Sequence, residues 1–322
     1  MNELPERDLP PGRHHLLREH LLTEIRQNEK TNENTNEKPY EKKTVPVPRR
    51  NAKIWFRPAL VAGAVAASVA AAVLVASPFG DQAAQAGPPS KETVRMLEEI
   101  AAAAEKQPMP KEIRDDQYVY IKSKVGYVSD DEDGGPGKLD PVHSREMWYS
   151  VDGKHDDMRH EPAKGAEHEA MEAETPLMPT DTYYRNLQKL PTDPVNMLDW
   201  LHKESEGGSG EDQATFTLVG DLSHESLMPP EQAAALWLAA AKIPGVELID
   251  DVVDVEGRHG VAIAREDQGI REELIFDKET KQFLGEREVA VEDLPSGAEK
   301  GDVLGLSAVL ERTVVDKAGQ RP

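Results

Sequence analysis

The residues of this chain that could support chemistry are mainly histidines and clustered carboxylates. His155, His160 and His168 fall in a segment rich in Asp and Glu, and the 322 residues contain no cysteine. A zinc site usually combines His, Cys and carboxylate ligands at short spacings, whereas this segment has the composition of a surface loop. We therefore expect the histidines to lie at the surface and to bind no metal ion.

One acidic run partly follows the pattern of a calcium-binding loop. In the sequence SDDEDGGPGKLD, residues 129–140, Asp131, Asp133 and Gly134 match two ligand positions and the sharp turn of such a loop. Ser129 stands where the first Asp ligand belongs, and Asp140 replaces the bidentate Glu. These departures favour a solvated acidic turn over a cation site.

Sequence motifs of catalysis do not stand out. The chain has no G-x-S-x-G, no H-E-x-x-H and no glycine-rich phosphate loop. Without cysteine it can form no disulfide, no thiolate metal site and no cysteine nucleophile. The sequence therefore predicts a protein that is not an enzyme and that has no cofactor and no metal.

Helix and strand patterns are mixed in the part of the chain after residue 90. Helices are predicted at 91–107, 194–204 and 229–245, each opened by a capping residue or a proline. Alternation predicts a strand at 116–128 and a hairpin at 144–161. The polar, proline-containing segment 161–182 is expected to be a loop. The segment 211–226 fits a helix or a strand, and we favour the helix.

The last third of the sequence predicts a sheet. Apolar and polar residues alternate through 245–292 and 302–317, with a hairpin turn at 277–280, which indicates about five antiparallel strands. One face is expected to be apolar and the other polar. The predicted apolar face comprises Val246, Leu248, Val261, Ile263, Leu274, Phe276, Leu284, Val289 and Val291. The fold class is α+β, with a curved antiparallel sheet packed with helices over residues 91–322.

The apolar run at 58–79 predicts a single transmembrane helix. Residues 59–77 carry no charge, and a span of about 20 apolar residues crosses a bilayer. Arg49, Arg50, Lys53 and Arg57 precede the run. The positive-inside rule then places the N-terminus in the cytoplasm and residues 91–322 outside the cell membrane, beyond a linker at 80–90.

Other interpretations of this run remain open. Ala84-Gln85-Ala86 would suit cleavage of a signal peptide, and Arg49-Arg50 would suit twin-arginine export. The residues before the run, however, are far more numerous than an ordinary signal peptide has. The run could also be a buried alanine-rich helix of a soluble protein. We favour the signal-anchor, with the membrane bilayer as its partner.

The segment before the membrane differs in charge from the rest. Residues 1–57 hold 12 Lys and Arg against 9 Asp and Glu, a net charge of +3, whereas the remaining residues hold 26 against 51, a net charge of −25. Nucleic-acid binding needs cations that contact phosphates. We therefore expect the acidic outer domain to bind no nucleic acid.

A short amphipathic helix is predicted within residues 1–27, followed by a disordered basic tether at 28–57. Such a stripe suits docking into the groove of a cytoplasmic partner. It would also suit a helix resting on the inner leaflet. The apolar stripe consists of Leu17, Leu21, Leu22 and Ile25.

Several segments together resemble a known group of proteins. They are QYVYIKSKVGY, REMWYSVDG, YYRNLQKLPTDP, PPEQAAALWLAAAKIPGV, GRHGVAIARED and LERTVVDKAGQRP, together with the alanine-rich anchor. They resemble an uncharacterised family of actinobacterial single-pass membrane proteins, which are often encoded beside extracytoplasmic-function sigma factors. The resemblance covers most of the chain and implies an anti-sigma-like regulatory role with a sigma factor as partner. The outer domain is also similar to the curved-sheet lipoprotein-carrier fold.

Two functions follow as expectations. In the first, the chain is a membrane-anchored regulatory or sensor protein whose outer domain binds a ligand or partner, with the N-terminal helix engaging a cytoplasmic protein. In the second, the outer domain is an envelope carrier for an apolar or lipid ligand, and the cytoplasmic tail is inert. The cysteine-free sequence lacks the zinc-binding motif of some anti-sigma factors.

Overall fold

The computed structural model describes residues 86–129, 137–173, 176–205 and 210–322. The predicted amphipathic helix, basic tether and transmembrane helix, and most of the linker at 80–90, lie outside the described residues. No helix in the described part is both long enough and apolar enough to span a membrane.

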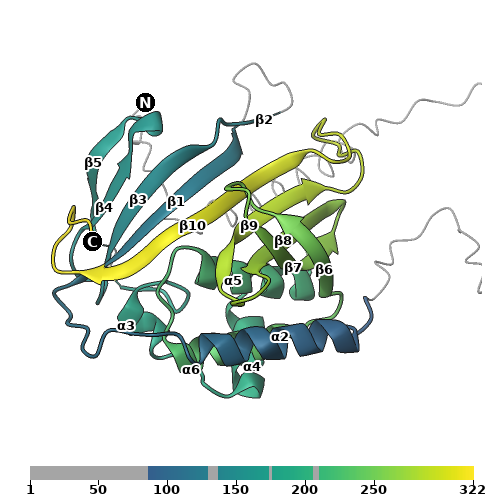
Figure 1. Ribbon diagram of the computed structural model, residues 1–322, viewed down its shortest axis with the longest axis horizontal. Coiled ribbons are helices and arrows are strands. Elements are labelled where there is room, and N and C mark those ends of the chain that lie inside the picture. The colour runs from purple at the N-terminus through teal and green to yellow at the C-terminus, as the bar shows by residue number, and fades with distance from the viewer. Residues whose placement is uncertain (1–85, 130–136, 174–175, 206–209) are drawn as a thin grey trace, which may run out of the picture. The chain divides into compact units, whose positions relative to one another are not determined.

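The described residues form one ten-stranded sheet in which all paired strands are antiparallel (Figure 1). The strand order is β5-β4-β3-β1-β10-β9-β8-β7-β6, and the short β2 pairs with β1. The long β10 joins the two halves because it pairs with β9 on one side and β1 on the other. The strands are β1 (Tyr118–Ser129), β2 (Lys138–Leu139), β3 (His143–Ser150), β4 (Asp157–Glu161), β5 (Ala166–Met171), β6 (Glu247–Val253), β7 (His259–Asp267), β8 (Ile270–Asp277), β9 (Phe283–Ala290) and β10 (Val303–Val315).

Helices α2, α4, α5 and α6 gather beside the β6–β9 half of the sheet (Figure 1). Helix α2 contacts α6 and β6, and α5 contacts β7 and β9. The helices are α2 (Lys91–Ala104), α3 (Tyr184–Leu187), α4 (Pro194–Glu204), α5 (Glu211–His224) and α6 (Pro230–Ala240), with a 3₁₀ turn at Pro162–Lys164.

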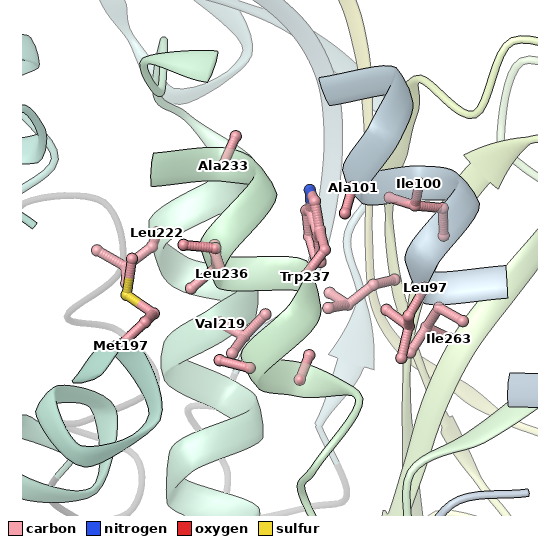
Figure 2. Close-up of a cluster of buried hydrophobic side chains, with 14 of the residues drawn as sticks. Leu97, Ile100, Ala101, Met197, Val219, Leu222, Ala233, Leu236, Trp237 and Ile263 are labelled. Carbon is pink, nitrogen blue, oxygen red and sulfur yellow. The ribbon is translucent and has the colours of Figure 1, made fainter. Parts of the chain in front are cut away.

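The main core fills the space between these helices and the sheet (Figure 2). Trp237 of α6 packs edge-on against Phe276 of β8, with ring centroids 4.9 Å apart. Leu97 and Ile100 from α2 and Leu236 from α6 are at most 1% exposed. Because burial of apolar area is the main force for folding, this half of the sheet holds its helices firmly.

Capping by Asp193 defines where α4 begins. Its carboxylate accepts hydrogen bonds from the backbone N–H groups of Val195 and Asn196, both at 3.0 Å. We expect Asp193→Ala to lower the free energy of unfolding by about 1 kcal/mol, because two N–H groups lose their acceptor. Asp193→Asn keeps the acceptor and should lose less than half as much. Urea denaturation of both variants measures the difference, and equal losses would contradict the capping role.

Several sequence expectations are confirmed. Residues 211–226 contain helix α5, the segment 144–161 is the β3–β4 hairpin, and the last third supplies the five strands β6–β10. The α+β class and the antiparallel sheet with helices packed on it are therefore correct.

The expected loop at 161–182 is wrong in part, because it contains the 3₁₀ turn and β5. Strand β5 is an edge strand that pairs only with β4, and its side chains are mostly exposed. Backbone pairing with β4, rather than an apolar pattern, makes this segment a strand. Sequence alternation does not reveal such a strand.

The predicted division of the sheet into an apolar and a polar face is also wrong in part. Leu284 does not join the helix-covered face but packs with Val252, Ala262 and Ile275 in a separate cluster. The cause is a register shift in β8–β9, where Ile275 pairs with Gly285 and Phe276 with Phe283. The extra residue turns Leu284 to the opposite face.

Candidate functional site

The site residues expected from the sequence lie outside the described residues. This applies to the docking stripe Leu17, Leu21, Leu22 and Ile25 and to the membrane-flanking Arg49, Arg50, Lys53 and Arg57. They remain predictions.

A cluster of charged side chains lies at the end of α5, between the two halves of the sheet. Its centre is Glu225, the residue that ends α5 and is 4% exposed. We call it the Glu225 cluster. Its members are Ser123 of β1, Arg145 and Tyr149 of β3, His224 of α5, the following C-cap residue Glu225, Glu286 of β9, and Ser307 and Arg312 of β10.

Glu225 is held by polar groups on two strands. The Tyr149 hydroxyl donates to Oε2 at 2.6 Å, and the Ser123 hydroxyl approaches Oε1 at 3.5 Å. Arg145 Nη2 lies 3.5 Å from Oε2. Burial alone would raise the pKa of Glu225, but the Arg145 and His224 charges and these hydrogen bonds hold the pKa below its usual value. Glu225 is therefore an ionised carboxylate inside the protein.

His224 is oriented by a second carboxylate. Its Nδ1 pairs with Glu286 Oε1 at 2.5 Å, and its Nε2 lies 3.9 Å from Glu225 Oε1. Burial alone would lower the pKa of His224, but the Glu286 charge and hydrogen bond raise it above the usual value. The ring thus connects the carboxylates of α5 and β9.

The ionic contacts continue into β4. Arg145 Nε lies 3.7 Å from Glu161, and His143 Nε2 lies 2.7 Å from the same carboxylate. Glu161 is 5% exposed. Acidic and basic groups therefore alternate from Glu286 on β9 across α5 and β3 to Glu161 on β4.

Arg312 of β10 contacts the C-terminal end of α5. Its Nη2 donates to the backbone carbonyls of Ser223 and His224, at 3.0 and 2.8 Å. Cations favour the C-terminal end of a helix, where carbonyls lack partners. Burial lowers the pKa of Arg312 to about 10. The Glu225 charge acts on this guanidinium and partly opposes the effect of burial. Among the described residues, Arg312 forms no ion pair.

The sequence contains a signal for this cluster that the apolar pattern hides. Arg145 alternates in phase with Met147 and Tyr149, which are buried against the helix-facing side of the sheet. A charged residue in the apolar phase of a strand needs a partner. The partner, Glu225, lies 80 residues later, so the sequence does not identify it.

The histidines expected at the surface contact single side chains. His155 faces Asp152 at 3.2 Å, and His160 packs edge-on against His168 with centroids 4.8 Å apart. Within the described ranges, no group of three or more His, Asp or Glu side chains is placed to hold a metal ion.

A hollow of about 420 Å³ lies on the other face of the sheet, lined by polar and charged side chains that include Tyr120, Lys122, Glu146 and His160. Glu146 accepts from Tyr120 at 2.6 Å and is bridged by the Arg321 guanidinium. These contacts, with Arg321 the strongest, lower the pKa of Glu146 to about 2. The carboxylate there is already fully paired.

Asp157 makes stability depend on pH. Burial raises the pKa of Asp157 to about 7, although Ser150 N–H and the Tyr183 hydroxyl donate to it. The folded state thus keeps a proton that the unfolded state, with a pKa near 3.8, releases. This contribution to stability is complete below pH 4 and is lost as the pH rises through 7.

We expect the Asp157 contribution to fall by about 2–3 kcal/mol between pH 5 and pH 8. Asp157→Asn mimics the protonated form, so its unfolding free energy should change less over that range and exceed that of the wild type at pH 8. Urea denaturation at both pH values measures this. Parallel pH profiles for the two proteins would contradict the assignment.

Comparison with known proteins finds no protein-family model and no curated protein that matches this chain. Eight chains of solved structures match it. The Pseudomonas aeruginosa MucA/MucB complex is 12% identical, with 72% of this chain and 58% of that chain covered and a TM-score of 0.24.

Two further matches are a crystal structure of MucB, at 13% identity and a TM-score of 0.23, and MucB in complex with MucA(peri), at 11% and 0.22. They cover 73% and 72% of this chain and 62% and 59% of those chains. The chain thus spans about three fifths of these solved chains. At such TM-scores the regulatory role remains a proposal.

Proposed function

We propose that this chain is a membrane-anchored regulatory or sensor protein without catalytic activity, whose outer domain, residues 91–322, binds a ligand or partner. The observation that carries the proposal is the Glu225 cluster. Removing charges from water costs several kcal/mol per ion, so buried ion pairs add little net stability. Their best-attested use is to specify or switch an arrangement, and here they connect the two halves of one sheet.

The arrangement around His224 favours binding over catalysis. A histidine oriented by a carboxylate at Nδ1 can act as a general base when its Nε2 faces a nucleophile. In this chain Nε2 has the Glu225 carboxylate 3.9 Å away, and a carboxylate cannot give up a proton that it does not hold. The pair is therefore suited to holding charge in place.

The cytoplasmic part of the proposal rests on the sequence. We infer that the stripe Leu17, Leu21, Leu22 and Ile25 docks onto an extracytoplasmic-function sigma factor, while the basic residues from Arg49 to Arg57 keep the N-terminus in the cytoplasm. The support is the amphipathic spacing and the family resemblance.

Capture of a sigma factor by the full-length chain in detergent tests the docking. The wild type should retain a sigma factor identified by mass spectrometry, and Leu17→Asp with Leu21→Asp should lose it. Arg26→Asp, on the polar side of the same helix, is the matched control and should keep it. Capture that survives the double substitution, or no capture by the wild type, would overturn this part.

Protease added to intact cells tests the topology separately. The outer domain should be digested while an epitope placed near residue 30 stays protected. Protection of residues 91–322 would reverse the proposed orientation.

The structure does not favour an apolar-ligand carrier. On the β6–β9 half, the helix-facing side is filled by its own core, including Trp237 and Phe276. On the other half, the helix-facing side is filled by its own buried residues, such as Ile121 and Met147, beside the charged Arg145 and Glu161. A lipid chain would have to displace packed aromatic rings or lie against charges.

A further inference from the structure

Unsatisfied hydrogen-bond donors gather in the Glu225 cluster. Five buried side-chain nitrogen or oxygen atoms in the described residues have no hydrogen-bond partner, and four belong to this cluster. They are Arg145 Nε, His224 Nε2, Ser307 Oγ and Arg312 Nε. Leaving a buried polar group unpaired costs about 1–3 kcal/mol, so four in one place call for an explanation.

These residues share one side of the sheet. Ser307 pairs in register with Glu286 of β9 and with Val125 of β1. Glu286 in turn binds His224, and Arg312 binds the carbonyl of His224. Since directly paired residues of neighbouring strands project to the same face, Ser307 lies beside this pair.

All four unpaired groups can donate. The guanidinium N–H groups only donate, the hydroxyl can donate, and His224 Nε2 donates when the ring is protonated. A partner that completes them must supply acceptors, and Arg312 has neutral carbonyls as its acceptors. The group that completes them is therefore rich in acceptors. Carboxylates already lie 3.7 Å from Arg145 Nε and 3.9 Å from His224 Nε2, so a negative charge on this group would balance mainly the Arg312 guanidinium.

Tyr127 of β1 lies at the exposed edge of this part of the sheet. The residue is 39% exposed, but burial of its hydroxyl raises its pKa, and the charges of Glu286, Arg145 and Glu225 also act on it. The Glu286 side chain is itself 23% exposed. Glu288, also near Tyr127, makes the approach acidic, which selects against highly charged anions.

We propose that the Glu225 cluster binds a small monocarboxylate, held by Arg312, Ser307, Arg145 and His224. This inference rests on the proposed function, since it names the class of ligand that the outer domain binds. The carboxylate of this ligand accepts hydrogen bonds from Arg312 Nε and Ser307 Oγ. Its negative charge balances that of the Arg312 guanidinium. Planar carboxylate oxygens suit guanidinium donors.

The test adds acetate to the full-length chain in detergent. Acetate should raise the melting temperature in a saturable way at constant ionic strength, while chloride at the same ionic strength should not. Titration calorimetry should show binding weakened at least tenfold by Arg312→Gln and several-fold by Ser307→Ala. Arg321→Gln, an exposed arginine on the other face, is the control and should bind as the wild type does.

Two results would overturn the inference: stabilisation by acetate no greater than that by chloride, or equal acetate affinity in Ser307→Ala and the wild type. If Arg312→Gln does not fold, Ser307→Ala decides, because it removes only one hydroxyl. Failure here leaves sigma-factor capture unaffected, whereas loss of capture with intact acetate binding would reject the cytoplasmic role and keep the site.

Discussion

Arg145→Met lowers the free energy of unfolding by about 3–5 kcal/mol, because it leaves the Glu225 carboxylate buried without its cation. The side chains of Glu225 and Arg145 are 5% and 8% exposed, so water cannot replace the lost partner. The Tyr149 hydrogen bond remains but carries no positive charge. Urea denaturation at pH 7 measures the loss.

The pH dependence identifies the cause of this loss. In the wild type, Arg145 helps to hold the Glu225 pKa below its usual value. Without Arg145, burial raises the pKa of Glu225, so that the folded variant takes up a proton more readily than the unfolded chain. The difference in unfolding free energy between the variant and the wild type should therefore shrink as the pH falls from 7 to 5, because the Asp157 contribution is common to both proteins.

A double-mutant cycle provides the matched control. Glu225→Gln removes the charge and keeps a side chain that can accept from Tyr149, so Arg145→Met combined with Glu225→Gln should be more stable than Arg145→Met alone. If the two losses simply add, the charges do not interact, and the Glu225 cluster is not the unit described above. Arg95→Met, whose partner Glu99 is exposed on α2, should cost less than about 1 kcal/mol.

The sequence predicts those elements whose determinants are local. Helices α2 and α4 lie where the sequence predicts them. Their caps are Ser90 and Asp193, and a capping side chain needs only the next three residues. The five C-terminal strands follow from alternation. The strand β5 escapes prediction because its pairing with β4, not its composition, defines it.

The residues of the candidate site are far apart in the sequence, so no short segment predicts that they are in contact. Arg145 and Glu225 meet because β3, β1 and β10 are neighbours and because α5 ends over them. A one-residue change in register would move such a side chain to the other face. The sequence shows that a charged residue such as Arg145 stands at a strand position where apolar residues are expected. Its partner cannot be identified before the strand order is known.

Gly285 lies where the register of two neighbouring strand pairs is set. It lies in β9 with φ +153°, where the register of β8–β9 shifts, and it pairs with Ala308 of β10. A Cβ added at Gly285 would lie 2.1 Å from the Ser307 carbonyl oxygen and 2.8 Å from its carbon. Both atoms belong to a paired backbone, so they cannot move aside as a flexible side chain would.

We therefore expect Gly285→Ala to destabilise the protein by on the order of 4 kcal/mol or more. It should also lower the hydrogen-exchange protection of β9 and β10 more than that of α2. The adjacent Glu286 would be displaced from His224, so the Glu225 cluster should be disturbed as well. Urea denaturation and hydrogen exchange measure these effects.

Gly257→Ala separates the close contact from backbone strain. Gly257 also has a positive φ, +80°, but a Cβ there would meet no atom within 4 Å. Its substitution should cost only about 1 kcal/mol, the usual price of a left-handed conformation for alanine. A loss in Gly285→Ala within 1 kcal/mol of that in Gly257→Ala would mean that β10 can retreat from β9. In that case the two halves of the sheet are not held in one register at β10, and the Glu225 cluster cannot be what aligns them.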